Sequence, residues 1–122
     1  MATGTIPNEE GYTVLYDTNF QTGQVTLKES IANFKYIEIT FGNVVYRVEN
    51  NFSSTYSLTL CSYGIDTSSS NPGLIMSFIG MSFSGTTANV TTHWRQFSYK
   101  NSPTPVIDNT LYNYVQQIRG YR

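Results

Sequence analysis

A run of three chemically active side chains, His93-Trp94-Arg95, is the first feature of this sequence that could recognise a ligand. Indole is the best flat surface for stacking on a sugar ring, and imidazole and guanidinium supply hydrogen-bond donors or charge for hydroxyl and phosphate groups. In a strand, alternation directs His93 and Arg95 to one face with Phe97 and Tyr99, and Trp94 to the other. A second arrangement fits equally well, with the indole in the core and its two neighbours on the surface.

Two aspartates are further candidates because they fall in segments predicted to be loops. Asp66 lies in the predicted loop 64–73, and Asp108 ends the proline-bearing segment 101–108. Saccharide sites commonly combine an aromatic surface with carboxylates that accept hydrogen bonds from hydroxyl groups, although aspartate also favours turns for purely local reasons. The candidate ligand-binding residues are therefore Asp66, His93, Trp94, Arg95 and Asp108.

No motif of a catalytic or metal site accompanies these residues. His93 is the only histidine, and with Trp94 and Arg95 beside it the segment does not resemble a nucleophile motif of a serine-type triad. Cys61 is the only cysteine, so no other cysteine is available for a zinc site around His93. The eight acidic residues form no recognisable pair, and the glycines form no phosphate-binding loop. We expect a binding module without cofactor or metal rather than an enzyme. A glycan hydrolase would require two acids within glycosidase range in one cleft.

Size and charge narrow the class further. The 122 residues suit one domain, charged residues make up only 12%, and seven Lys and Arg nearly balance eight Asp and Glu. Without a basic stripe, we expect no nucleic-acid partner. No apolar run is long enough for membrane insertion and no amino-terminal signal is evident, so we expect synthesis in the cytoplasm.

Short strands separated by turns account for the chain from Tyr12 onward. The clearest is 35–41, where apolar and polar residues alternate, and Gly42-Asn43 connects it to 44–48 in a predicted hairpin. Ser30 to Asn33 is predicted to be a short irregular connection. Further strands are predicted at 12–16, 25–27, 56–61, 74–83, 88–92, 93–99 and 111–121.

The segment 74–83 is unusual because it carries apolar residues on both faces. Two arrangements would cover both faces: one face packs in the core and the other against a second subunit, or the strand lies wholly inside one sandwich. The overall pattern indicates an antiparallel β-sandwich or jelly roll over residues 12–122. Residues 1–11 are expected to be an arm that orders on assembly, or an artificial boundary.

Both ends of this predicted domain resemble one family. Tyr12–Asp17, followed by 23–39 with its Leu27-Lys-Glu-Ser-Ile and Asn33-Phe-Lys-Tyr-Ile elements, resembles the start of the carboxy-terminal head domains of tail-fibre and baseplate receptor-binding proteins from phages or prophages of Gram-positive bacteria. The ending 115–122 resembles their final strand, although Gln116-Gln117 stands where more apolar residues are usual. The middle of the chain carries no such resemblance.

The resemblance implies a homotrimeric β-sandwich or jelly-roll head in the virion tail. Such a head attaches without cofactor to host cell-wall saccharide or a teichoic-acid-like polymer, and it contacts other tail or baseplate proteins. Clefts between subunits and the loops of the middle segment would then hold the ligand. The alternative is a trimerisation or assembly domain of a fibre or baseplate that binds no receptor itself.

Overall fold

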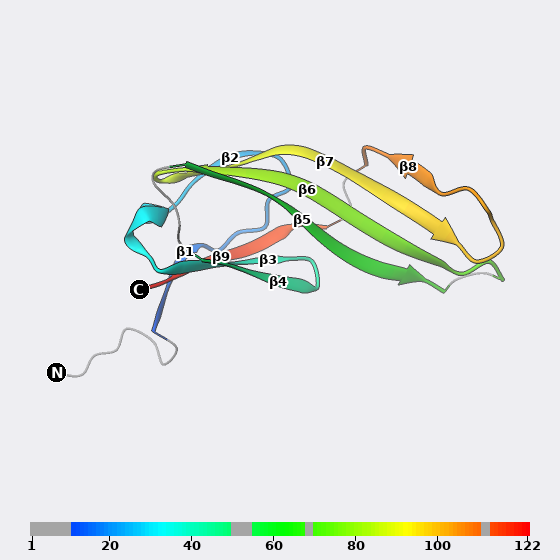
Figure 1. Cartoon of the computed structure of the whole chain (residues 1–122), viewed down its shortest axis with the longest axis horizontal. Helices are drawn as coiled ribbons and strands as arrows, with labels where there is room; N and C mark the ends of the chain where they lie inside the picture. Colours follow the sequence, from blue (N-terminus) through cyan, green and yellow to red (C-terminus); the bar gives the residue numbers. More distant parts are fainter. Residues whose placement is uncertain (1–10, 50–54, 68–69, 111–112) are drawn as a thin grey trace.

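The computed structural model describes residues 11–49, 55–67, 70–110 and 113–122, which fold into two antiparallel sheets (Figure 1). The first sheet has the strand order β1-β9-β3-β4 and consists of β1 (Tyr12–Tyr16), β9 (Val115–Tyr121), β3 (Tyr36–Phe41) and β4 (Val44–Glu49). The second has the order β2-β7-β6-β5, with β8 also pairing β7, and consists of β2 (Gly23–Thr26), β7 (Thr87–Tyr99), β6 (Gly73–Ser84), β5 (Thr55–Asp66) and β8 (Val106–Asp108). The predicted all-β antiparallel sandwich is confirmed, and the trimer stays a prediction. Apart from Gly11, the predicted arm 1–11 lies outside the described residues.

The hairpin β3–β4 shows how sequence pattern becomes structure. Ile37, Ile39 and Phe41 alternate with polar residues and are completely buried. Gly42 turns the chain with a φ of 60°, a conformation that glycine adopts without steric cost. The predicted hairpin is therefore confirmed.

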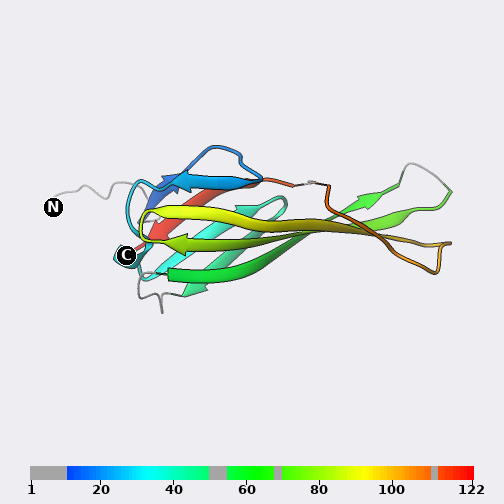
Figure 2. The ribbon, with the colours of Figure 1, turned by 90° about the horizontal axis from the view of Figure 1, so that it is seen from above.

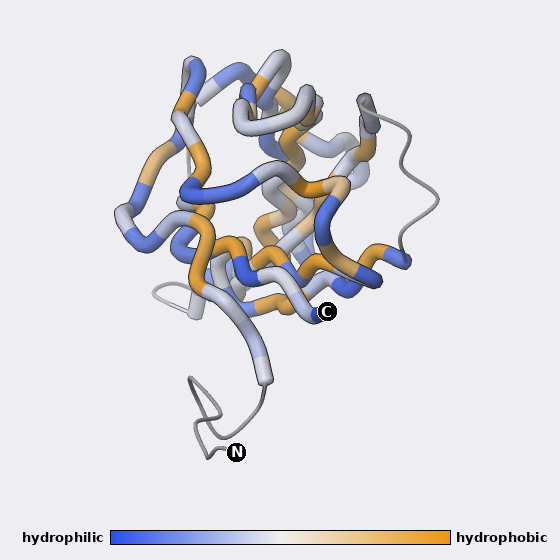
Figure 3. Tube along the Cα trace, turned by 90° about the vertical axis from the view of Figure 1, so that its left-hand side faces the viewer, coloured by the Kyte–Doolittle hydropathy of each residue, from blue (hydrophilic) through white to orange (hydrophobic). Residues whose placement is uncertain are grey.

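A single hydrophobic core lies between the two sheets. Apolar and polar residues alternate along the strands (Figure 3), so each sheet presents one apolar face to the other. The predicted connection at 30–33 contains η1 (Ile31–Asn33), a single turn of 3-10 helix whose Ile31 side chain joins the core. Within the described residues, no helix has both the length and the apolar character needed to cross a membrane.

The second sheet is longer than the first and projects beyond it (Figure 2). Its strand β5 continues to Asp66, so the predicted strand 56–61 was too short and Asp66 ends a strand rather than lying in a loop. The strand β6 lies between β5 and β7 throughout. We call the part of the second sheet that extends beyond the first sheet the projecting sheet. It comprises 61–66 of β5, 73–78 of β6, 94–99 of β7, and β8.

One continuous strand, β7, replaces the two strands predicted at 88–92 and 93–99. Met81 pairs with Val90 while Gly80 pairs with Thr92, so Thr91 is an extra residue and forms a bulge. The bulge reverses which residues face the core. Val90 faces the first sheet before it, and Trp94 faces away after it. The bulge at Thr91 lies next to the predicted boundary between these two strands.

Two other boundaries differ from prediction. The strand β9 begins at Val115, whereas the predicted strand began at Leu111, and residues 111–112 lie outside the described residues. The strand predicted at 74–83 is not wholly inside one sandwich, because the Leu74 residue is 41% exposed. Its core-facing residues are covered by the first sheet near the sandwich, and its other face carries the surface described below.

Candidate functional site

An open hollow lies where the edge of β7 has no neighbouring strand. On this side of β7, β2 pairs as far as Val90 and β8 pairs from Arg95 onward, so within the described residues the stretch 91–94 has no strand partner there. The hollow has a volume of about 500 Å³, within the usual size range of small-ligand sites. It is lined by Thr91, Thr92, His93, Trp94, Ile107 and Asn109.

Trp94 forms an aromatic wall of this hollow. Its ring stacks on Phe78 of β6, with ring centroids 3.9 Å apart and planes 12° from parallel. Because β6 and the hollow lie on opposite sides of β7, the stack covers one face of the indole and turns the other toward the hollow. Gly80 leaves room at the bulge, since a Cβ there would lie 2.6 Å from Thr92 Oγ1. The indole is partly exposed, so the arrangement with Trp94 in the core is wrong.

His93 and Arg95 lie on the opposite face of the sheet from Trp94, as alternation predicts. His93 is paired with the buried Ile79, and its Nδ1 atom is itself buried with no hydrogen-bond partner among the described residues. The guanidinium of Arg95 lies over the ring of Phe97, 4.5 Å from its centroid. The run 93–95 therefore divides between two faces of one sheet.

A bidentate ion pair joins β7 to β8. Arg95 Nε donates to Asp108 Oδ1 at 2.7 Å and Arg95 Nη2 donates to Oδ2 at 3.2 Å, while the Thr110 N–H donates to Oδ1 at 2.9 Å. The hydrogen bonds from Arg95, followed by the one from Thr110, lower the pKa of the Asp108 carboxyl to about 2. Asp108 ends β8, not the loop predicted around it, and its carboxylate holds β8 in place.

The depressed pKa of Asp108 predicts an acid-dependent contribution to stability. Because the pKa is lower in the folded chain than in the unfolded one, the contribution is present above about pH 4 and disappears as the pH falls toward about 2. We expect Asp108→Asn to be less stable than the natural chain near neutral pH, with the difference shrinking over this interval. Urea unfolding at a series of pH values measures it. A difference that does not change with pH would contradict the assigned ion pair.

Asp66 lies apart from the other candidates. It pairs with Gly73, which in turn pairs with Tyr99, so Asp66 sits at the far tip of the projecting sheet, five residues along β7 from Trp94. It does not line the hollow beside Trp94. Of the five predicted residues, Trp94 and His93 line the hollow, Arg95 and Asp108 form an ion pair on the adjoining segment, and Asp66 is separate.

The outer face of the projecting sheet, directed away from the first sheet, is mostly apolar, with Gln96 and Ser98 of β7 as its polar members. Paired residues on neighbouring strands share a face, which brings together Cys61, Tyr63, Ile65, Leu74, Met76, Phe78, Trp94 and Ile107. We call these residues the outer apolar patch. Ile65 is 70% exposed, Ile107 59% and Tyr63 55%. Nearer the sandwich the same face is polar, with Ser57, Thr59 and Ser82 among its residues.

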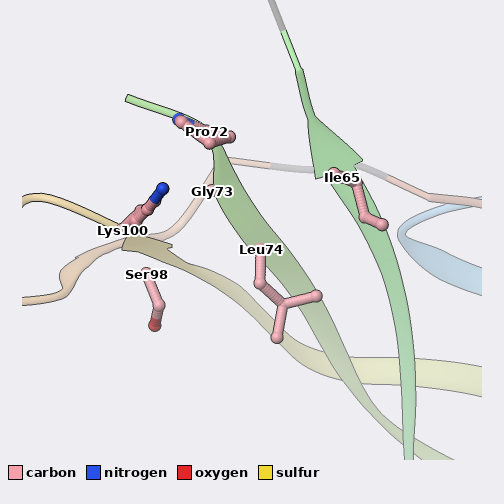
Figure 4. A pocket seen from close by; sticks show the side chains of 6 residues that line it. All are labelled: Ile65, Pro72, Gly73, Leu74, Ser98 and Lys100. Carbon is pink, nitrogen blue, oxygen red and sulfur yellow. The ribbon is translucent and has the colours of Figure 1, made fainter. Parts of the chain in front are cut away.

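The tip of the outer apolar patch contains a second hollow, of about 320 Å³ (Figure 4). Ile65 and Leu74 lie there on the neighbouring strands β5 and β6, and Ser98 and Lys100 come from β7 and the residues just after it. In the part of the chain that the structure describes, no carboxylate lines either of these two hollows. Among the described residues, no group of three or more His, Cys, Asp or Glu side chains could hold a metal ion.

Sequence reasoning missed the residues that complete the hollow beside Trp94, namely Thr91, Thr92, Ile107 and Asn109. Thr92 is brought to Trp94 by the bulge at Thr91, and Ile107 and Asn109 arrive through the short strand β8, which the sequence pattern did not predict. No protein-family model matches the chain, and a search of curated proteins finds no significant match.

Proposed function

We propose that this protein is the receptor-binding head domain of a phage or prophage tail, which attaches to carbohydrate on the host cell surface without catalysing a reaction. The observation that carries the proposal is the hollow beside Trp94, which joins an aromatic wall to hydrogen-bonding groups in an open, ligand-sized space. The resemblance of 12–39 and 115–122 to such head domains supports the tail assignment.

The hollow offers the groups that a sugar needs. The free face of Trp94 can pack against the C–H groups of a pyranose ring, and the Thr92 hydroxyl and Asn109 amide can exchange hydrogen bonds with its hydroxyls. The unpaired edge of β7 at 91–94 adds backbone donors and acceptors. Phe78 stacks behind the indole and holds it upright, which lowers the entropy lost on binding.

Self-association is the second part of the proposal, with a homotrimer as its form. At the tip of the outer apolar patch, away from Trp94 and the hollow, Tyr63, Ile65 and Leu74 leave large side chains in water that a neighbouring subunit would cover. Addition of a strand to the edge of β5 is hindered in its middle, because the Tyr46 hydroxyl hydrogen-bonds with the Cys61 N–H and carbonyl, and Asn43 Oδ1 accepts from the Tyr63 N–H. The subunits are therefore expected to meet through sheet faces. Several copies would multiply weak single-site binding.

Replacing Trp94 tests the carbohydrate site. We expect Trp94→Leu, which keeps an apolar residue over Phe78, to weaken adsorption to host cells about tenfold or more, equivalent to ~1.4 kcal/mol. Thr92→Val and Asn109→Ala are expected to give smaller losses in the same direction. Binding of the purified protein to cells, and its inhibition by isolated wall polysaccharide, provides the measurement.

A matched control is Tyr36→Leu, which removes an aromatic residue from the outer face of the first sheet. Adsorption by this control should equal that of the natural protein. Unchanged adsorption by a folded Trp94→Leu protein would exclude the hollow as the receptor site.

An assembly domain that binds no receptor is the second candidate, and the outer apolar patch is the observation that favours it. Such a domain would form stable oligomers through the patch and contact other fibre or baseplate proteins. Stable trimers that fail to adsorb to any host cell would favour this function. Cell adsorption that wall polysaccharide inhibits would favour the receptor-binding head.

A further inference from the structure

The electrostatic character of the hollow beside Trp94 selects among the ligands that a receptor-binding head could recognise. Bacterial wall polymers differ in charge, since some are uncharged polysaccharides and others carry a phosphate in every repeat. Phosphate is commonly bound by Arg, Lys or protonated His side chains or by helix amino termini. The charge of the lining is therefore informative about the ligand.

The lining supplies hydroxyl, amide, aromatic and aliphatic groups and one imidazole, that of His93, and among the described residues neither lysine, arginine nor carboxylate belongs to it. The hollow faces outward with Thr92, Trp94 and Ile107. The register directs the imidazole of His93 to the opposite face, beside Ile79, where Nδ1 is buried. The part of the hollow that meets solvent is thus formed mainly by uncharged groups.

The cation nearest along the strand is Arg95, and two features keep it from serving the hollow. Its register with Ser77 places it on the inner face of the sheet, opposite Trp94. Its guanidinium is held by both carboxylate oxygens of Asp108, which neutralise its charge. An anion in the hollow would consequently lose hydration without gaining a charged partner.

We infer that the hollow binds an uncharged pyranose unit of a wall polysaccharide and does not bind the phosphate group of an anionic polymer. This inference rests on the proposed function. The indole takes the apolar face of the sugar, and Thr92 and Asn109 take its hydroxyls. Specificity among sugars follows from which hydroxyls reach these two side chains.

Calorimetric titration of the intact protein with two probes tests the inference. The probes are neutral wall-polysaccharide fragments and a poly(glycerol phosphate) free of sugar substituents, each at low and high salt. We expect binding of the neutral fragments, with affinity changing by less than about twofold between the salt conditions because no exposed charge pair is screened. Trp94→Leu should lower this affinity about tenfold or more.

The possible outcomes separate this inference from the proposed function. Cell adsorption together with binding only of the phosphate polymer, falling steeply with salt, would overturn the inference and leave the receptor-binding function intact. Binding of neutral fragments that Trp94→Leu leaves unchanged would also overturn it. If the natural protein adsorbs to no host cell and binds neither probe, the proposed function itself fails.

Discussion

Replacing Ile65 and Leu74 together by lysine is expected to convert the proposed trimer into monomers. The two residues pair across β5 and β6 at the tip of the outer apolar patch and are 70% and 41% exposed. Burying a large aliphatic side chain contributes about 1.5–3 kcal/mol. Their removal costs an oligomer about 2 kcal/mol or more per subunit. Two unpaired ammonium groups in the interface add a further desolvation cost.

Sedimentation velocity over micromolar concentrations measures this effect, and circular dichroism verifies that the variant is folded. The matched control carries Ser57→Lys and Thr59→Lys, which add the same charge to the polar half of the same face. The control should keep the oligomeric state of the natural protein. A folded Ile65→Lys, Leu74→Lys protein with unchanged mass would show that subunits meet elsewhere. A natural protein that is monomeric throughout would rule out self-association.

Loss of the oligomer should also weaken attachment to cells more than loss of any one hydrogen bond in the hollow. Each subunit would present one hollow, and simultaneous engagement raises the apparent affinity by a factor of about 100 or more when the geometry permits it. The monomeric variant should bind soluble sugar fragments with nearly the same affinity per subunit as the natural protein, because each fragment occupies one hollow. Comparing fragment binding with cell adsorption separates the two contributions.

Local alternation predicted the central part of the fold. Ile37, Ile39 and Phe41 share a face that the sequence pattern marks as apolar, and the hairpin after them follows from Gly42-Asn43. These features depend on residues close in the chain. The pairing of β9 between β1 and β3 depends on contacts between the two ends of the chain, and periodicity carries no information about it.

The site was harder to predict because one residue changes the direction of the side chains. The extra residue Thr91 moves the alternation by one position, and the sequence analysis divided the chain near this point into two strands instead of predicting a bulge. The opposite placement of Trp94 and Arg95 was predictable, since it follows from alternation within 93–99. The partnership of Arg95 with Asp108 was not, because it requires the chain to return after a proline-bearing loop.

The apolar strand β6 illustrates a different limit. Its sequence shows two apolar faces, but whether the second face is covered depends on how far the opposing sheet extends. The strand β6 has 12 residues while β3 and β4 have six each, so the first sheet cannot cover the full length of the second. The projecting sheet therefore results from unequal strand lengths. The strand predicted at 56–61 stopped at Cys61, so the sequence analysis did not show that β5 continues into the projecting sheet.

The second large effect is expected at Gly120, where the closing strand β9 packs against Phe34. A Cβ at Gly120 would lie 2.6 Å from two carbons of the Phe34 ring, and that ring is only 2% exposed, so it has little room to move. We expect Gly120→Val to destabilise the chain by about 3 kcal/mol, the upper part of the usual range for an overfilled core. Denaturant unfolding measures the change.

Phe34→Leu is expected to rescue Gly120→Val in part, because the smaller side chain gives up the space that the valine enters. The two substitutions should thus be strongly non-additive, as expected for residues in direct contact. Ser57→Thr, which adds one methyl group to an exposed strand position, serves as the control and should change stability by less than about 0.5 kcal/mol. Equal destabilisation by Gly120→Val with and without Phe34→Leu would show that the Phe34 ring is not the obstacle. Packing against Phe34 would then not explain why β9 needs glycine at position 120.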